Sequence, residues 1–127
     1  MAVTVLTLKP LAEGTILTGV TVGAANTLYA NVVGEDCTVK SIMAYNQHTS
    51  AIRVYLLRVP DSTGSVGTPD INDIFYSESI SAKGSIMLGY PDIDIQLNNT
   101  NDTVMAYVDT TASKIHVWVT GWVYPSV

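Results

Sequence analysis

The clearest pattern in the chain is the alternation of side chains over residues 115–124. Because neighbouring side chains in a strand point to opposite sides of a sheet, this run has two faces. One face consists of small or branched apolar residues: Ile115, Val117, Val119, Gly121 and Val123. The other face carries His116, Trp118, Thr120, Trp122 and Tyr124. The first face suits a sandwich core, and the run predicts a strand inside a sheet rather than at an exposed edge.

Two interpretations of the aromatic face stay open. In the first, the strand is buried on both faces, because aromatic side chains are often interior. In the second, the row of Trp118, Trp122 and Tyr124 contacts another subunit or a partner, since Trp and Tyr combine an apolar body with a polar tip. Both interpretations require that the row be covered.

Shorter runs of the same kind occur along the rest of the chain. Clean alternation predicts three inward sets: Ile52, Val54 and Leu56; Ile93, Ile95 and Leu97; and Val104, Ala106 and Val108. Further strands are predicted at residues 26–33, 74–80, 85–90 and 37–46, the last with its orientation left open because its faces are mixed. The one long loop is 60–73, and loops of such length are often functional or mobile.

These runs together predict the fold class. No stretch of about 12 or more residues has the i, i+3, i+4 spacing of a helix. Short strands separated by turn signals about every 8 to 12 residues are typical of a sandwich or barrel. We therefore predict an all-β protein, an antiparallel β-sandwich of about eight strands with jelly-roll-like topology.

The N-terminal part of the chain is expected to contribute least to the compact core. Its two β-prone runs, residues 2–9 and 15–22, are interrupted by Pro10 and Gly14, which commonly end regular structure. The predicted boundaries are 1–22 for an N-terminal segment, as an extended arm or first strands, and 23–127 for the β-sandwich domain.

Composition limits the class of partner. Hydrophobic residues make up 47% of the chain and charged residues 13%, about half the usual charged share of roughly 25%. This balance indicates that much surface is hidden, either inside the protein or against neighbours. The net charge is −5, and the six Lys and Arg residues are scattered. A partner nucleic acid or an anionic membrane is not expected, because each needs a concentrated basic face.

Candidate catalytic and redox groups are few. His48 and His116 lie in no motif that sets a base against a nucleophile. Cys37 is the single cysteine, so an internal disulfide is excluded. Its acidic neighbours Glu35 and Asp36 are expected to raise the pKa of the thiol and so to lower its reactivity. We predict that the chain is not an enzyme and has no catalytic residue.

Acidic side chains form two groups that could be read as calcium ligands. Asp92 and Asp94 share one face of a predicted strand, and Asp70, Asn72 and Asp73 cluster in the long loop. Oxygen ligands suit calcium, but the order of residues does not match an EF-hand loop. The carboxylates are therefore interpreted as solvated, and we predict no metal site and no cofactor.

Apolar side chains on outward faces point to assembly instead. Large apolar patches on soluble proteins usually mark contacts, and an extended N-terminal segment can add as a strand to the edge of a neighbour's sheet. The predicted interface residues are Val3, Val5, Leu6, Leu8, Arg53, Tyr55, Leu57, Trp118, Trp122 and Tyr124, with Arg58 as a further rim contact.

The strand residues resemble those of a group of small virion proteins of tailed bacteriophages. The matching residues are Thr27-Leu28-Tyr29; Val39-Lys40-Ser41-Ile42 with Asn46; Val54 to Val59 with Pro60; Ile93 to Leu97; Asp102-Thr103; and Val117 to Gly121. They cover roughly residues 26–123, and the first 25 residues lie outside the matched pattern. The resemblance implies a β-sandwich that is a structural part of a virion. Within that class it favours a capsid decoration (cement) protein that binds and stabilises the assembled phage head as a homotrimer.

The same resemblance implies partners and a location. The partners are other copies of the chain and the major capsid protein. The chain is expected to be made in the host cytoplasm and to end on the outer surface of the capsid. Two alternatives are a neck, tail or fibre component of the virion, and a carbohydrate-binding β-sandwich module. In the carbohydrate-binding module, Trp118, Trp122 and the long loop would form the sugar site.

Overall fold

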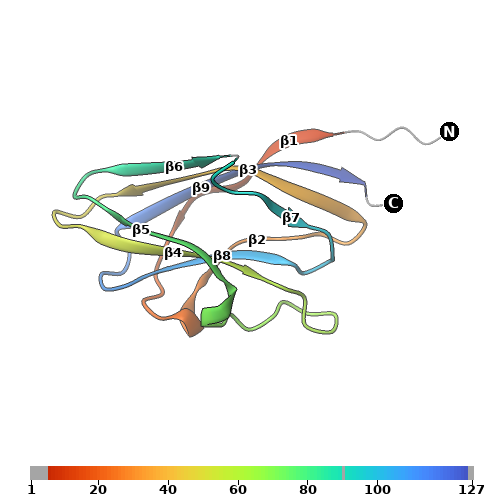
Figure 1. The fold of residues 1–127 in the computed structure, drawn as a ribbon, viewed down its shortest axis with the longest axis horizontal. Coiled ribbons are helices and arrows are strands. Elements are labelled where there is room, and N and C mark those ends of the chain that lie inside the picture. Colours follow the sequence, from red (N-terminus) through yellow and green to blue (C-terminus); the bar gives the residue numbers. More distant parts are fainter. Residues whose placement is uncertain (1–5, 90, 126–127) are drawn as a thin grey trace.

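The computed structural model describes residues 6–89 and 91–125, which form nine strands and two short 3-10 helices (Figure 1). The strands are β1 (Thr7–Ile16), β2 (Asn26–Ala30), β3 (Glu35–Asn46), β4 (Ile52–Val59), β5 (Ile74–Ile80), β6 (Ser85–Gly89), β7 (Ile95–Leu97), β8 (Thr103–Val108) and β9 (Ile115–Pro125). The 3-10 helices are η1 (Val22–Ala24) and η2 (Ile71–Asp73).

The strands are arranged as a jelly roll of two antiparallel sheets. Sheet A has the order β1-β9-β3-β6, with β7 also paired to β3, and sheet B has the order β2-β8-β4-β5. β1 pairs with β9 in sheet A, and β2 pairs with β8 in sheet B. This nested pairing of early with late strands across two sheets is the topology of a jelly roll. The predicted antiparallel, jelly-roll-like sandwich is confirmed. β9 lies between β1 and β3, so its predicted place inside a sheet is also confirmed.

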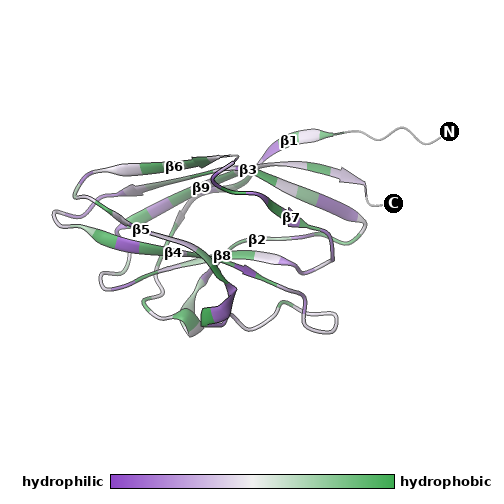
Figure 2. Ribbon diagram, in the orientation of Figure 1, coloured by the Kyte–Doolittle hydropathy of each residue, from purple (hydrophilic) through white to green (hydrophobic). Residues whose placement is uncertain are grey.

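The core lies between the two sheets and is built from alternate residues of the strands. All three predicted inward sets, on β4, at the β7 segment and on β8, are buried, as is the small apolar face of β9. The alternation of apolar and polar positions can be followed along the strands in Figure 2. Side chains of both sheets meet in a single large cluster, which holds the layers together through burial of apolar surface.

The N-terminal segment contains a first strand, which was one of its two predicted forms, but the strand bounds and the contribution to the core differ from the prediction. β1 is one continuous strand that runs through Pro10 and Gly14, and residues 17–22 are not a strand. Ala12 and Leu17 are buried in the main core, so this segment does contribute to it. A proline is tolerated here because β1 is an edge strand, where an N–H directed away from the sheet has no partner to lose. Residues 1–5 lie outside the described part of the chain.

Both neighbours of β9 carry a bulge at the level of Gly121. On β1 the register shifts between Pro10 and Ala12, which makes Leu11 the extra residue. On β3 it shifts between Val39 and Ser41, which makes Lys40 the extra residue. The Leu11 side chain lies over Gly121, where an added Cβ would be 2.6 Å from its Cδ1 atom. Gly121 therefore makes room for the side chain that the bulge adds to the core.

The outer face of sheet B is largely covered by the chain itself. A second buried cluster on this face contains Leu57, Val59, Met105 and Tyr107. Val22, from η1, packs against this cluster, and both 3-10 helices lie beneath sheet B in Figure 1. Tyr55 stacks on Tyr107 with ring centroids 4.6 Å apart. All six residues of β8 are buried, which means that this strand is covered on both faces.

Two buried asparagines tie the turns at opposite ends of the sandwich. At the end of β3, the Nδ2 group of Asn46 donates to the carbonyl oxygens of Ser50, Ile80 and Ser81 at 3.0, 3.0 and 3.3 Å. Its Oδ1 atom accepts from the His48 N–H at 2.8 Å. At the start of β3, the Nδ2 group of Asn31 donates to the carbonyl oxygens of Glu35, Leu97 and Asn99 at 2.8, 3.1 and 3.1 Å.

A buried carboxylate joins the two sheets at one side. Asp102 accepts hydrogen bonds from the Asp61 and Asn99 backbone N–H groups at 2.9 and 3.1 Å, and from Nη2 of Arg58 at 3.2 Å. Arg58 also donates from Nε and Nη2 to the carbonyl oxygen of Gln96 at 3.0 and 2.9 Å. Because Arg58 lies on β4 and Gln96 on β7, this side chain links sheet B to sheet A.

Candidate functional site

The outer face of sheet A carries large apolar and aromatic side chains that the rest of the protomer leaves partly uncovered. Strand register aligns one row across all four positions of the sheet: Glu13, Trp118, Met43 and Met87. Of these, Trp118 is 37% exposed and Met87 is 70% exposed. This row is therefore an apolar ridge that crosses the sheet and ends on an acidic side chain at the β1 edge.

Two further rows extend the same surface along the strands. They are Ile16, His116, Tyr45 and Ser85 on one side of the ridge, and Leu8, Trp122, Thr38 and Gln96 on the other. Tyr124 follows at the end of β9, opposite Asp36. We call the surface made by Leu8, Ile16, Met43, Tyr45, Met87, Trp118, Trp122 and Tyr124 the sheet A face.

The position of Trp118 depends on a bulge in β1. The register shifts between Glu13 and Thr15, so that Gly14 is the extra residue, with φ of 73°. A Cβ at Gly14 would lie 3.5 Å from three atoms of the indole ring, so the ring rests against this glycine. The His116 ring stacks on the indole with centroids 6.2 Å apart. The indole thus packs against Gly14 and His116, while Trp118 remains partly exposed.

Trp122 and Tyr124 are half-buried near the end of the sandwich where β1 begins. Leu8 lies opposite Trp122, and the hydroxyl groups of Tyr124 and Thr38 are 3.4 Å apart. An open hollow of about 460 Å³ at this end is lined by β1, the β2–β3 turn and the end of β9. The turn contributes Val33, which is among the most exposed apolar side chains described.

The predicted interface residues do not share one surface. Leu8, Trp118, Trp122 and Tyr124 lie on the sheet A face, and Leu6 comes just before β1 with 59% of its surface exposed. Arg53, Tyr55 and Leu57 belong to the outer face of sheet B, on the other side of the molecule. Val3 and Val5 lie outside the described residues.

Several of the residues on sheet B have partners within the protomer. Leu57 has no exposed surface, because Met105 lies opposite it in the second cluster, and it drops out of the candidate surface. Nη1 of Arg53 donates to Oγ of Ser77 at 3.3 Å. Arg58, suggested as a rim contact, is engaged with β7 and the β7–β8 turn of its own chain.

Four residues of the sheet A face were not predicted: Ile16, Met43, Tyr45 and Met87. Regular alternation would put Val39, Met43 and Tyr45 on one side of β3. The bulge at Lys40 changes the phase, so that Val39 is buried while Met43 and Tyr45 face outward. No feature of the local sequence marks that bulge.

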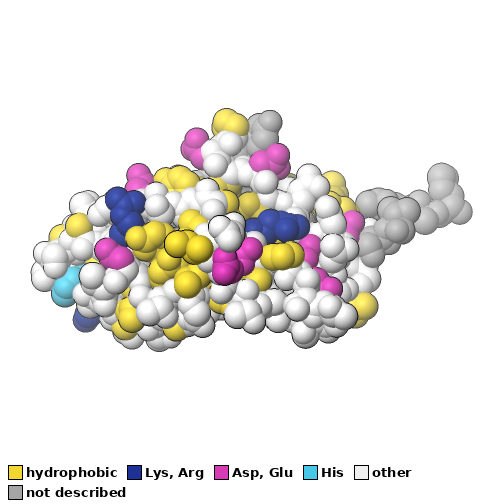
Figure 3. All heavy atoms as spheres, turned by 60° about the horizontal axis from the view of Figure 1, so that its bottom comes forward, with side chains coloured by type: hydrophobic (Ala, Val, Ile, Leu, Met, Phe, Trp, Pro, Cys, Tyr) yellow, Lys and Arg dark blue, Asp and Glu magenta, His cyan; other side chains and the backbone are white. Residues whose placement is uncertain are grey.

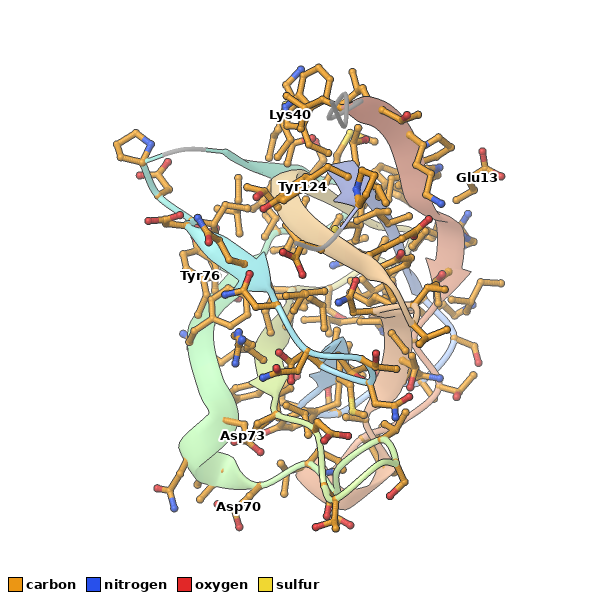
Figure 4. The ribbon with its side chains drawn as sticks, turned by 90° about the vertical axis from the view of Figure 1, so that its right-hand side faces the viewer. Glu13, Lys40, Asp70, Asp73, Tyr76 and Tyr124 are labelled. Carbon is orange, nitrogen blue, oxygen red and sulfur yellow. The ribbon has the colours of Figure 1, made fainter. Side chains whose placement is uncertain are left out.

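Charged side chains on the sheet A face are few and of both signs. Glu13 lies at the β1 edge, Asp36 lies opposite Tyr124, and the exposed Lys40 is the bulged residue of β3. In Figure 4, Glu13 projects outward from β1, while Asp70 and Asp73 lie at the opposite side of the molecule near η2. The loop carboxylates are therefore separate from this face.

A different side of the molecule has a smaller apolar patch. A hollow of about 350 Å³ beside Arg58 is lined by Phe75, Pro91, Ile93 and Ile95, together with Asp92 and Asp94. On the face shown in Figure 3, apolar side chains gather between basic and acidic groups. The hollow itself is bordered by charge, because Arg58, Asp92 and Asp94 are among its lining residues.

The Cys37 thiol and the carboxylates of Asp70 and Asp73 are held by contacts within the protomer. Cys37 is fully buried, and burial raises the pKa of its thiol to about 11, with the Glu35 charge adding to the rise and the Lys9 charge opposing it. The Asp73 carboxylate accepts from the Asp70 N–H at 2.9 Å, and that of Asp70 accepts from the Asn72 N–H at 2.9 Å. These two acidic residues therefore cap η2.

Among residues 6–89 and 91–125, no three His, Cys, Asp or Glu side chains are placed to hold a metal ion. Within the same part of the chain, no helix has the length and apolar character needed to cross a membrane.

Comparisons with known proteins show what this fold is similar to. No protein-family model matches the chain, and no curated protein matches it in sequence. Among solved structures, a chain from the disulfide-linked pili of Bacillus endospore appendages is similar, with a TM-score of 0.53 and 12% identity, over 99% of this chain and 93% of that chain.

A second similar chain comes from a virus-like particle. It belongs to the cryo-EM structure of the extra small virus of the giant freshwater prawn Macrobrachium rosenbergii, with a TM-score of 0.50 and 10% identity, over 100% of this chain and 82% of that chain. The two similar structures are thus of a pilus and of a viral particle. At such low identity, the likeness establishes a shared β-sandwich fold.

Proposed function

We propose that this chain is a non-enzymatic structural subunit of a virion, and specifically a capsid decoration (cement) protein that binds the assembled phage head as a homotrimer. The observation that carries the proposal is the difference between the two sheets. Sheet B has its outer face covered by the chain's own turns, whereas sheet A leaves a broad apolar face open. An extended apolar surface of this kind is typical of a contact with another protein.

The fold supports the same class of function. Jelly-roll sandwiches are common in viral capsid proteins, and the two similar structures come from a pilus and a viral particle. The scattered basic residues give no concentrated positive face, so the partner is a protein and not nucleic acid or an anionic membrane. The proposed partners are other copies of this chain and the major capsid protein.

The proposed mechanism is purely physical. A protein that binds the assembled shell, but not its free subunits, shifts the equilibrium toward the shell by mass action. A trimer makes several contacts at once, so that weak individual contacts give strong attachment. In this proposal the chain is made in the host cytoplasm and ends on the outer surface of the head, where it reinforces the contacts between capsid subunits.

The test uses heads of the source virus that lack this chain. We expect the purified chain to sediment with assembled heads and not with dissociated major capsid protein, and to raise the temperature at which the heads open. Light scattering after size exclusion is expected to give three times the mass of the chain. Equal binding to free subunits and to heads, or no binding to heads, would refute the decoration role.

Two alternatives predict other outcomes of the same experiments. A neck, tail or fibre component would bind tails or neck complexes and would be present in a few copies per virion, which quantitative electrophoresis of whole particles measures. A carbohydrate-binding module is favoured by one observation, the partial exposure of Trp118. In that case, added glycans would change the quenching of tryptophan fluorescence by small solutes.

A further inference from the structure

We infer that self-association uses the sheet A face, on which a second copy of this chain packs side chain against side chain, and not the addition of a strand to a sheet edge. The inference rests on the self-association in the proposed function and adds the surface and the mode of contact.

All four sheet edges are interrupted. On sheet A, β1 contains Pro10 and two bulges, and the other edge is shared by β6 and β7, of five and three residues. On sheet B, the register of β2 shifts at Leu28 and that of β5 shifts at Phe75, which is the residue left unmatched between Tyr76 and Ile74. Short, bulged or proline-containing edges prevent strands of other chains from pairing with a sheet. The contact between copies is therefore made by side chains.

Charge favours the sheet A face and a second copy as its occupant. Each chain has a net charge of −5, so two copies repel each other unless they meet where charges are few and mixed. On the sheet A face Glu13 and Asp36 are accompanied by Lys40. The other side chains in the rows of this face are apolar, aromatic or uncharged polar groups such as Thr38 and Ser85, together with His116. A partner surface with many charges of one sign would find no complementary electrostatic potential on this face.

The size of the face fits one neighbouring subunit. β1, β9 and β3 have 10, 11 and 12 residues, and the fourth position is shared by β6 and β7 with five and three residues. At about 4.8 Å between strands and roughly 3.3 Å per residue, these positions span an area on the order of 600 Å². Contacts of standard size bury about 800 Å² on each partner. Trp118, Met43 and Met87, which follow one another across β9, β3 and β6, can supply adaptable apolar contacts across this area.

The experiment compares three charge substitutions by light scattering and sedimentation over a range of concentrations. Met87→Glu and Ile16→Glu each place a carboxylate on the sheet A face at an exposed position, where folding tolerates it. Ile71→Glu is the matched control, because Ile71 is an apolar side chain of similar exposure to Met87, at 67% against 70%, but lies in η2 on the sheet B side. Circular dichroism and thermal unfolding check that all three variants fold.

We expect Met87→Glu and Ile16→Glu to weaken self-association by about tenfold or more, because each buries a charge in the contact, and Ile71→Glu to leave it unchanged. Hydrogen exchange adds an independent readout: amides of β2 and β5 are expected to exchange at the same rate in the assembly as in the dilute chain. If Met87→Glu and Ile16→Glu associate as strongly as the wild type, and amides of β2 or β5 become protected in the assembly, then this inference is wrong. The proposed self-association would still stand. A wild-type chain that stays monomeric at every concentration would overturn the proposed self-association as well.

Discussion

Asn46 provides the sharpest test of how the ends of the sandwich are held together. Its side chain has no exposed surface and makes four hydrogen bonds, three donated to carbonyl oxygens and one accepted from a backbone N–H. Substitution Asn46→Ala removes them all and leaves the carbonyl oxygen of Ile80 buried without its donor. At about 1 kcal/mol per hydrogen bond, with two N–H groups shared among three acceptors, the expected loss is about 3–4 kcal/mol of unfolding free energy.

The matched control is Asn98→Ala, because Asn98 is exposed and lies in a turn; its expected effect is within about 0.5 kcal/mol. Urea unfolding followed by tryptophan fluorescence measures both variants at a concentration where light scattering shows the same mass. Equal stability of Asn46→Ala and the control would refute the assigned role.

The isosteric variant Asn46→Asp separates the loss of hydrogen bonds from mere loss of packing. It keeps the shape of the side chain but places a carboxylate against three carbonyl oxygens, which together with burial raises its pKa in the folded state. A raised folded pKa means that stability is fully present below the unfolded value of about 3.9 and is lost as the pH rises through the folded value. We therefore expect Asn46→Asp to be most stable in acid, whereas the difference between Asn46→Ala and the wild type stays constant with pH.

Three further substitutions test other features. Gly121→Ala is expected to cost about 1–3 kcal/mol of stability, because the added methyl group would lie 2.6 Å from a leucine Cδ1 atom of β1. The control is Gly23→Ala, which is expected to be neutral because an added Cβ there would have no atom within 4 Å. The Cys37 thiol, with an ordinary pKa of 9.0 raised to about 11 by burial, should make the chain lose about 2–3 kcal/mol of stability as the pH rises from 9 to 11. That part of the loss is expected to vanish in Cys37→Ala, and an identical pH profile for both chains would contradict the burial of the thiol. Arg58→Met should cost about 1–3 kcal/mol, because it removes the cation beside the buried Asp102 carboxylate, while the partial exposure of Arg58 screens the pair and two backbone N–H groups still donate to Asp102. Denaturant unfolding checks this, and a loss below about 0.5 kcal/mol would show that the link between the sheets is weak.

The strands that could be predicted from the sequence are those whose two faces keep one character throughout. In β9 every inward residue is small or branched, and in β4 the set Ile52, Val54 and Leu56 is equally uniform. The full extent of β1 could not be predicted in this way, because Pro10 and Gly14 normally end a strand. Both fit only because β1 is an edge strand with bulges, and its partner comes from the other end of the chain.

The candidate surface was partly predictable for the same reason. Trp118, Trp122 and Tyr124 stand in one row of one strand, which the sequence shows directly. Met87 joins that row only through the pairing of β6 with β3 and of β3 with β9. Neighbours across strands depend on register, and the bulge at Lys40 sets that register without a local signal. Conversely, Leu57 was predicted as an interface residue; it does lie on the outer face of sheet B, but the second cluster, with Val22 of η1 packed against it, buries it.

The order of strands in sheet A has a consequence for synthesis. Protein chains emerge from the ribosome N-terminus first, yet the strand that lies between β1 and β3 is β9, which is made after all the other strands described. Until β9 emerges, β1 and β3 have no strand between them. The backbone groups and apolar side chains that β9 contacts in the folded sheet are then left without that partner. Sheet A therefore closes only after translation reaches the end of β9, since pairing of such distant segments cannot begin earlier. A product truncated before β9 lacks Trp118 as well as the strand that completes the sheet, so only chains that extend through β9 present the surface proposed for assembly.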